Sequence, residues 1–316
     1  MYLIAVALTA ALAAAAPPKP TVGYIGLGTM GSSMARHLNV ASTEAGGRPA
    51  LVWNRTPGKA AAHAAEHGTV ACETASELAA EADVVCLCLS TTNDVQAVLA
   101  DLPLRPGALV IDCTSGEPAA TRALAAELKA RGISFVDAPV SGGPSGASAG
   151  TLTSMCGGSE EDFAAAAPWI NAWSSKVVHC GTEVGAGDAV KSINNVLNAA
   201  HVALAAEGLA TLKKLGVAPS VALSVINSSS GRSLQTEGNL PDNVVTRKFS
   251  YGFQLGLMRK DVGIAAELVK QQVPTATLIP AVQILFDAAV DELGAGADYT
   301  EVVKPLEHAT GVEITD

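Results

Sequence analysis

The chain has 316 residues, of which 49% are hydrophobic and 16% are charged, and its formal net charge is −10. This length predicts about two domains with a substantial core, and the acidic balance argues against a nucleic acid as the main partner. The six cysteines form no CxxC pair, so we expect reduced thiols in a non-oxidising compartment, without a disulfide framework and without a metal site.

The chain opens with an apolar leader, residues 1–20, whose first part reads MYLIAVALTAALAAAA. The segment resembles the apolar region of a secretory signal, but no basic residue precedes it, and it is short for a transmembrane helix. A mitochondrial transit peptide would carry arginine, and none occurs before Arg36. We therefore exclude the leader from the fold, expect no membrane association, and leave the location open between the cytoplasm and an organelle (mitochondrion or plastid).

The first predicted strand, Val22 to Ile25, leads into a glycine-rich turn with GxGxxG spacing, GLGTMG, and then into a helix pattern. In this context the first glycine permits a tight turn, the second lets a pyrophosphate approach the backbone, and the third allows close packing. The helix N-terminus adds free N–H groups. A purely structural turn is the minor alternative. The residues expected to bind the cofactor here are Gly26, Leu27, Gly28, Thr29, Met30 and Gly31.

The next predicted strand, Pro49 to Trp53, ends at residues that should contact the cofactor ribose. Asn54 stands where an acidic residue would hold a 2′-hydroxyl, whereas Arg55 can pair with a 2′-phosphate. Asn54, Arg55 and Thr56 therefore favour NADP over NAD, although Arg55 could instead be a solvated surface residue. The segment before Asn54 is longer than the usual ~20 residues, so we predict a loop insertion at Ala41 to Arg48.

Strand and helix patterns continue to alternate as far as Gly181. Strands are predicted at residues 69–72, 83–89, 107–112, 132–137, 152–155 and 177–179, and helices at 75–82, 118–131 and 160–173. Repeated βα units predict an α/β fold with a doubly wound, parallel, Rossmann-type sheet. Such sheets bind ligands beyond the carboxyl ends of their strands, which places Leu89, Ser90, Thr91 and Ser115 at the cofactor. For the hydroxyl residues, plain helix capping is an equal alternative.

The stretch DAPVSGGPSGASAGT follows the strand that ends at Asp137. So much Gly, Ser and Pro directly after a strand is typical of a binding loop, with a flexible crossover as the alternative. Ser141, Gly142 and Gly143 can present a hydroxyl and bare N–H groups to a carboxylate.

The longest helical pattern opens with GAGDAVKSINN, Gly185 to Asn195, and runs to Lys214. No charged residue interrupts it between Lys191 and Glu207, so we expect a helix buried through the middle of the molecule. Lysine is almost never fully buried without a partner or a task, and Asn195 lies one turn beyond Lys191. The alternative is that Lys191 extends its amine outward to water.

Beyond this helix the pattern is all-helical, with helices predicted at residues 219–227, 254–270, 275–293 and 300–307. We place the domain boundary near Gly181, between an NADP-binding domain at 21–181 and an all-α substrate and dimerisation domain at 182–316. The long helix forms the junction, where pockets commonly occur. Lys260 is expected to be either a solvated lysine or one that faces the cofactor.

Four blocks of the sequence resemble the β-hydroxyacid dehydrogenase family, which includes 3-hydroxyisobutyrate dehydrogenase, tartronate semialdehyde reductase and glyoxylate/succinic semialdehyde reductase. They are GLGTMG, DAPVSGG, GAGDAVKSINN and RKD at Arg259 to Asp261, in that order. The resemblance covers about residues 21–307. One block would be weak, but four in order are specific.

The resemblance implies roles for individual residues. It makes Lys191 the catalytic lysine and Asn195 its substrate-orienting neighbour, with Asn194 beside them. It assigns the substrate carboxylate to Ser141 and Gly142, and the nicotinamide end of the cofactor to Ser115 and Lys260. WNRT at Trp53 to Thr56 is similar to the NADPH-using glyoxylate reductase branch, whereas Ser90 departs from the proline of many relatives.

The activity implied is reversible hydride transfer between NADP(H), or NAD(H), and a short 3-hydroxy acid or its semialdehyde. Lys191 would donate a proton in reduction and accept one in oxidation, and apolar surroundings would lower its pKa. NADPH-dependent glyoxylate/succinic semialdehyde reduction is the alternative, because WNRT is similar to that branch whereas the segment from Ile226 to Asp261 looks more like bacterial 3-hydroxyisobutyrate dehydrogenases. A non-catalytic dinucleotide-binding scaffold would predict loss of the lysine, and 6-phosphogluconate dehydrogenase would need a longer helical half. The family implies a homodimer or homotetramer.

Overall fold

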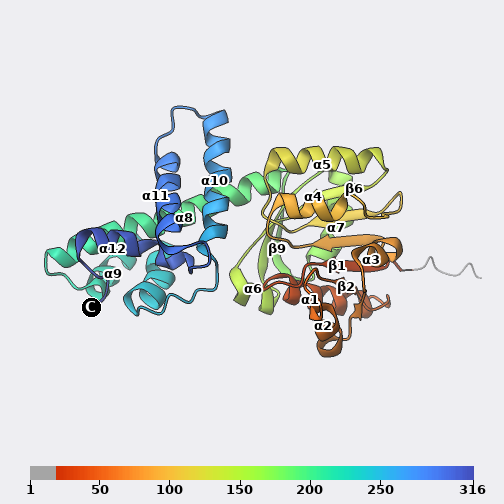
Figure 1. Ribbon diagram of the computed structural model, residues 1–316, viewed down its shortest axis with the longest axis horizontal. Coiled ribbons are helices and arrows are strands. Elements are labelled where there is room, and N and C mark those ends of the chain that lie inside the picture. The colour runs from red at the N-terminus through yellow and green to blue at the C-terminus, as the bar shows by residue number, and fades with distance from the viewer. Residues whose placement is uncertain (1–18) are drawn as a thin grey trace, which may run out of the picture.

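The computed structural model describes residues 19–316, so most of the leader, and the predictions made for it, lie outside the described residues. Two parts make up the molecule, one built on a sheet and the other all-helical, and the long helix α8 (Ala186–Lys214) runs from the first into the second (Figure 1). The sheet ends with β9 (Ser174–Gly181), directly before α8 begins.

The sheet has nine strands in the order β3-β2-β1-β4-β5-β6-β8-β7, with β9 paired to β8. The other bounds are β1 Val22–Ile25, β2 Leu51–Trp53, β3 Val70–Ala71, β4 Val84–Leu87, β5 Leu109–Asp112, β6 Ser134–Asp137, β7 Val140–Ser141 and β8 Leu152–Gly157. Strands β1 to β6 are parallel in the order of a dinucleotide-binding sheet, which confirms the Rossmann-type prediction. The sheet departs from the predicted parallel arrangement at one edge, where β8 runs antiparallel to β6 and β7.

Helices cover both faces of this sheet, so its central strands are buried on both sides and consist of apolar runs such as VVCL in β4. Their bounds are α1 Gly31–Glu44, α2 Lys59–His67, α3 Ala75–Glu81, α4 Thr92–Leu99, α5 Pro118–Ala130, α6 Gly143–Ala149 and α7 Glu160–Ile170. All six cysteines are free. Burial raises the pKa of the Cys88 thiol to about 12, so this thiol stays protonated and unreactive.

The first helix is longer than predicted. Residues 41–44 form the last turn of α1, so the predicted loop insertion at Ala41 to Arg48 is wrong over its first half. Asn39 fixes this turn, because its side chain donates to the carbonyl of His67 and accepts from the N–H of Ala50, both at 2.9 Å. The hydroxyl of Ser42 donates to the Arg48 carbonyl at 2.7 Å and closes the short connection that remains.

The second part is all-helical around its own core, which includes Leu240, Val262 and Phe286. Its elements are α9 Pro219–Asn227, the π-helix η1 Gln235–Val245, α10 Leu255–Gln272, α11 Leu278–Leu293, the 3₁₀ helix η2 Tyr299–Val303 and α12 Lys304–Thr310. Helices α10 and α11 form a hairpin that projects away from the body (Figure 1). Helix η1 was not expected, and it contains Pro241, which interrupts regular helical hydrogen bonding.

The absence of charged residues had suggested that helix α8 is buried on all sides. One side of the helix is in fact exposed. Val190, Leu197 and Leu204 lie on one stripe of the helix, and Leu204 is 71% exposed. The opposite side buries residues such as Val202 and Leu209 in the second core. The stripe is therefore an apolar surface of the chain. Among residues 19–316 no helix is long and apolar enough to cross a membrane.

Candidate active site

The start of α8 is fixed to the sheet by the side chain of Asp137, the last residue of β6. Its Oδ1 accepts from the N–H of Gly185 at 2.7 Å and its Oδ2 from the N–H of Asp188 at 2.9 Å. Gly185 has a φ of +90°, and a Cβ on Gly187 would lie 2.1 Å from the Met155 carbonyl oxygen. The glycines of GAGD therefore let the helix approach the strand ends, and Asp137 satisfies its free N–H groups.

A second buried carboxyl group fixes the same turn of α8 to the segment after β5 and to α5. Asp188 accepts from the N–H of Gly116 at 2.9 Å and from the hydroxyl of Thr121 at 2.8 Å. Burial, with the nearby charges of Asp137 and Asp112, raises the pKa of Asp188 well above its usual range. We call Asp137 and Asp188 the α8 joint, because together they hold the helix against the carboxyl edge of the sheet.

Lys191 lies about one turn beyond the joint and is only 8% exposed, which argues against an amine extended into water. Its Nζ donates to Oδ1 of Asn195 at 3.0 Å. Burial lowers the pKa of Lys191, and the charge of Lys260 adds to this effect while that of Asp261 opposes it. The structure thus places a buried amine with a lowered pKa beside an amide at the junction of the two parts.

Asp261 completes this network from α10. Its Oδ2 accepts from Nδ2 of Asn195 at 2.6 Å, and its Oδ1 lies 3.1 Å from Nζ of Lys260. Asp261 belongs to the RKD block, but no role was predicted from the sequence for it or for either residue of the α8 joint. Because Asp261 accepts from the amide nitrogen, the amide oxygen of Asn195 must face Lys191.

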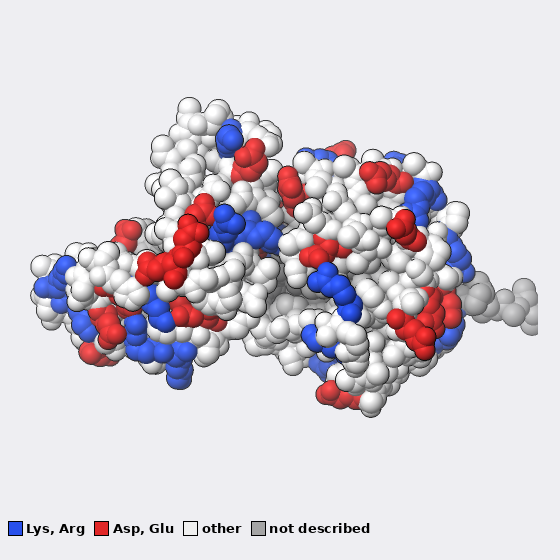
Figure 2. Space-filling view, in the orientation of Figure 1, with Lys and Arg blue, Asp and Glu red and all other residues white. Residues whose placement is uncertain are grey.

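Lys260 points inward to the sheet rather than into solvent. Its Nζ donates to the carbonyl of Ser115 at 2.6 Å and to that of Ser90 at 3.2 Å, beyond the ends of β5 and β4. Ser90 and Ser115 therefore meet Lys260 through their main chain and not through their hydroxyls. The hollow between the two parts, with basic side chains on its rim, is visible in Figure 2.

The glycine turn has the geometry that a dinucleotide requires. Gly26 has a φ of +98°, and a Cβ on Gly31 would lie 2.0 Å from the Gly26 carbonyl oxygen. Gly28 faces open space, and no side chain caps the N-terminus of α1, which leaves room there for a phosphate. The turn that carries Leu27, Thr29 and Met30 thus fits the cofactor predicted for it.

The residues after β2 are partly engaged within the protein. Oδ1 of Asn54 accepts from the N–H of Leu27 at 2.8 Å, and its amide donates to the Thr56 carbonyl at 3.3 Å, so Asn54 supports the turn. Arg55 is 83% exposed and pairs with Asp94 on α4 at 3.2 Å. Thr91 caps α4 by accepting from the N–H of Asp94, as the capping alternative predicts.

The predicted carboxylate loop lies where the two parts approach. Ser141 ends β7, and the next two residues, Gly142 and Gly143, have φ values of +137° and +65°. Leu89, just beyond the end of β4, donates its N–H to the Thr114 hydroxyl. These two glycines start α6, so what was expected as an open loop is partly helical. Asn194 is exposed on α8, and its Nδ2 donates to Oδ1 of Asn195 at 3.2 Å.

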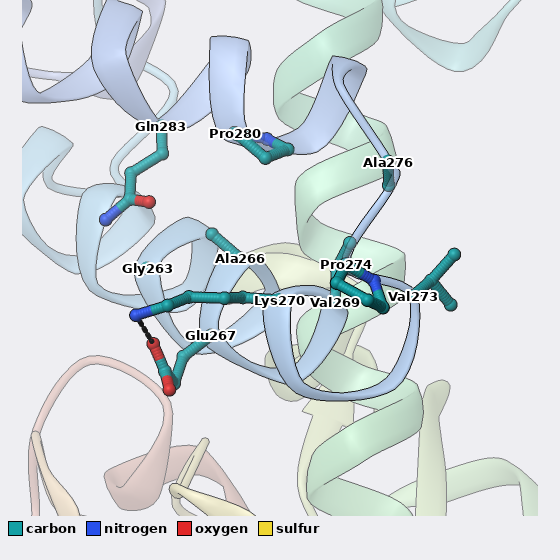
Figure 3. Close-up of a pocket in the computed structure, with 10 residues that line it drawn as sticks. All are labelled: Gly263, Ala266, Glu267, Val269, Lys270, Val273, Pro274, Ala276, Pro280 and Gln283. Carbon is teal, nitrogen blue, oxygen red and sulfur yellow. Dashed lines mark ion pairs between the residues drawn. The ribbon is translucent and has the colours of Figure 1, made fainter.

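A separate pocket of about 280 Å³ lies between α10 and α11 (Figure 3). Its two charged lining residues, Glu267 and Lys270, pair with each other at 3.5 Å. It contains no residue predicted for the site. Among the described residues, no cluster of three or more His, Cys, Asp or Glu side chains could hold a metal ion.

Comparison with known proteins gives two matches to family models. The NAD binding domain of 6-phosphogluconate dehydrogenase matches residues 21–181, and the NAD-binding domain of NADP-dependent 3-hydroxyisobutyrate dehydrogenase matches residues 185–306. The chain is also 34% identical over 300 residues to 2-(hydroxymethyl)glutarate dehydrogenase of Eubacterium barkeri, covering 93% of this chain and 97% of that protein. The chain belongs to the β-hydroxyacid dehydrogenase family.

Solved structures extend the comparison to the fold. The 3-hydroxyisobutyrate dehydrogenase of Mycobacterium tuberculosis with L-serine has a TM-score of 0.82 and 32% identity, covering 91% of this chain and 99% of that one. Psf3 in complex with NADP+ and 2-OPP has a TM-score of 0.79 and 25% identity, covering 90% and 100%. The protein is an NAD(P)-dependent oxidoreductase that acts on CH–OH groups.

Proposed function

We propose that this β-hydroxyacid dehydrogenase interconverts a short 3-hydroxy acid and its semialdehyde, with Lys191 as the group that gives and takes the proton. The observation that carries the proposal is the buried amine of Lys191, held at 3.0 Å from Asn195 at the junction of the two parts. A buried lysine with a lowered pKa is suited to acid and base work near neutral pH.

A nicotinamide cofactor, when bound at the glycine turn and the strand ends, would supply or accept the hydride. In reduction, the protonated Nζ of Lys191 donates a proton to the oxygen that becomes the hydroxyl. In oxidation, the neutral amine accepts the hydroxyl proton, and burial favours this form by lowering the lysine pKa. Both directions use the same atom, so the pKa of Lys191 sets how each rate depends on pH.

Asn195 and Asp261 orient the amine. The carboxylate of Asp261 holds the amide nitrogen of Asn195, which leaves the amide oxygen for Lys191. A fixed acceptor restrains the long lysine side chain near one position and so reduces the entropy lost on reaching the transition state. Asp261 also opposes the loss of the lysine proton, because its charge raises the pKa of Lys191.

The glycine turn and the strand ends would hold the cofactor. The residues assigned to it are Gly26, Leu27, Gly28, Thr29, Met30, Gly31, Asn54, Arg55, Thr56, Leu89, Ser90, Thr91, Ser115 and Lys260. We propose a preference for NADP, because Arg55 is exposed and can exchange Asp94 for a 2′-phosphate. The NADP-dependent family matched by residues 185–306 supports this preference.

Ser141, Gly142 and Gly143 would hold the substrate carboxylate, with Asn194 and Asn195 near the reacting end. The names of the relatives support a hydroxy acid, since hydroxymethylglutarate and hydroxyisobutyrate each combine a carboxylate with a hydroxyl group. Reduction of glyoxylate or succinic semialdehyde is the second candidate, favoured by Asn54-Arg55 after β2. Both candidates use the same lysine.

Steady-state kinetics with NADH and NADPH test the proposal. The substrates are glyoxylate, succinic semialdehyde, methylmalonate semialdehyde and tartronate semialdehyde, with 3-hydroxyisobutyrate for the reverse direction. Lys191→Ala should lose at least about a thousandfold in kcat while the Kd for NADPH is kept, as expected for loss of acid–base catalysis. The matched control is Lys176→Ala on an exposed strand position. Near-normal turnover in Lys191→Ala would contradict the mechanism.

We further propose that the functional unit is a homodimer or homotetramer. The support is the apolar stripe of Val190, Leu197 and Leu204 on α8, together with Leu278 and Ile284 on α11. Apolar side chains aligned in this way favour a protein contact. Light scattering of Leu197→Glu with Leu204→Glu should report a smaller assembly than the wild type. A monomeric wild-type chain would contradict this part of the proposal.

A further inference from the structure

The segment between η1 and α10 reaches from the helical part to the predicted carboxylate loop, and its backbone is unusual. Arg247 and Phe249 have φ values of +61° and +45° although neither is glycine. Arg247 forms two hydrogen bonds to Glu307, at 2.6 and 2.9 Å, and its guanidinium lies 4.6 Å from the Phe249 ring centroid. Such conformations persist only where the surroundings enforce them, so this segment is preformed.

Tyr251 lies at the centre of this segment and is held on both sides. The N–H of Ser250 donates to Asn243 at 3.1 Å, and that of Gly252 donates to Asp298 at 2.7 Å. The ring of Tyr251 packs edge-on against that of Tyr299, with centroids 5.1 Å apart. These contacts fix the direction in which the Tyr251 hydroxyl points.

The Tyr251 hydroxyl lies next to the sheet-containing part of the molecule. A Cβ on Gly143 would lie 3.2 Å from Oη of Tyr251, and one on Gly252 would lie 3.9 Å from the Pro144 side chain. Tyr251 therefore stands over the glycines that start α6. These are the same glycines that the proposed function assigns to the substrate carboxylate.

The Tyr251 hydroxyl forms no hydrogen bond to any other group among residues 19–316, although the side chain is half-buried. Burial, followed by the charge of Asp298, raises the pKa of Tyr251 above its usual value. The phenol consequently keeps its proton at neutral pH. A positioned donor without a protein partner is a ready hydrogen-bonding group for an anion.

We propose that Tyr251 donates a hydrogen bond to the substrate carboxylate and that its ring closes this end of the site to longer chains. This inference rests on the proposed function, which places the carboxylate at Ser141–Gly143. It assigns the helical part a substrate-binding group besides those on α8. The segment that carries Tyr251 thereby sets which chain length fits between Gly143 and Lys191.

Tyr251→Phe tests the hydrogen bond while it keeps the ring and its packing. A hydrogen bond to a charged group corresponds to roughly a tenfold to hundredfold change in binding, so KM for succinic semialdehyde should rise by about that factor, with kcat within about twofold. KM for butanal, which has the same chain length without the carboxylate, should not change. Ser250→Ala is the control, because Ser250 is exposed beside Tyr251 and engages Asn243 through its main chain.

The chain-length role is tested with Tyr251→Ala. Its ratio of kcat/KM for adipic semialdehyde over succinic semialdehyde should rise by about tenfold or more relative to wild type, as for loss of a close contact that excludes a longer ligand. An unchanged ratio overturns this role.

An unchanged KM for succinic semialdehyde in Tyr251→Phe overturns the hydrogen bond, and so does an equal rise for butanal. The Kd for NADPH, measured by fluorescence, should be the same in all these variants. Failure of the proposed function has a different signature: the wild type turns over none of the semialdehydes, or Lys191→Ala stays active. Either result overturns the proposed function and the Tyr251 inference together. If the enzyme is active and depends on Lys191 but its kinetics are the same in Tyr251→Phe, only the Tyr251 inference is overturned.

Discussion

The amine of Lys191 lies 3.0 Å from the amide oxygen of Asn195, and the amide nitrogen of the same residue lies 2.6 Å from the carboxylate of Asp261. Lys191 and Asn195 share one face of α8, whereas Asp261 comes from α10. The environment of the lysine amine therefore depends on the packing of these two helices, which Asp261 links through Asn195.

Asp261→Asn should shift the pH dependence of turnover to lower pH. The charge of Asp261 raises the pKa of Lys191, so its removal lowers that pKa further. The oxidation rate, which needs the neutral amine, would reach its plateau at lower pH, and the reduction rate would begin to fall at lower pH. The control is Asp287→Asn, which removes a carboxylate paired with Arg259 on the same hairpin. Identical profiles for Asp261→Asn and wild type would exclude this coupling.

Asp188→Ala should weaken the α8 joint. The change leaves the Gly116 N–H and the Thr121 hydroxyl without their buried acceptor. Each unsatisfied group costs about 1–3 kcal/mol, so urea unfolding should give a free energy of unfolding lower by about 2–6 kcal/mol. In the proposed mechanism kcat falls more than the affinity for NADPH, because the helix that carries Lys191 shifts. Asp101→Ala, at an exposed position, serves as the control, and an equal stability of both variants would refute the joint.

Asp112→Asn should stabilise the protein at alkaline pH. Burial raises the pKa of Asp112 to about 7, above the 3.8 of an exposed aspartate. The stability that this proton contributes is complete below pH ~3.8 and is lost as pH rises toward 7, with a total of about 4 kcal/mol. An amide needs no proton, so the gain in Tm over wild type should be larger at pH 8 than at pH 5. A difference independent of pH would show that ionisation of Asp112 is not involved.

Arg55→Ala should reduce the preference for NADPH. Loss of one charged contact to a 2′-phosphate predicts a rise in the KM for NADPH of roughly tenfold to hundredfold, with little change for NADH. Asp94→Asn should act in the opposite direction, because it frees Arg55 from its present partner. Arg48→Ala, which breaks another exposed ion pair, is the control. Equal effects on both cofactors in Arg55→Ala would contradict the assignment.

Local sequence patterns predicted those features of the structure that depend on residues close together in the chain. The GxGxxG spacing after an apolar strand predicted the turn at Gly26 because its geometry needs few distant contacts. Helical spacing likewise placed Asn195 on the Lys191 face of α8. In both cases the chemistry follows from residues less than two helical turns apart.

The remainder depends on pairs that are far apart in the chain. Asp137 is 51 residues from the Asp188 N–H that it accepts from, and Asn195 is 66 residues from Asp261. No local pattern indicates which carboxylate will meet which partner. The exposure of Leu204 was missed for a related reason, because the absence of charge does not distinguish a buried helix from one with an apolar surface.

Asp137 is both the anchor of α8 and the first residue of the DAPVSGG segment that leads to Ser141. In the proposed mechanism, Asp137 therefore fixes both the segment that binds the carboxylate and the helix that carries the lysine. The distance between these two groups determines how many carbons separate the carboxylate of the substrate from its reacting carbon. In a relative, a change in the segment after Asp137 would alter the chain length of the acid that fits the site, with the lysine in the same position.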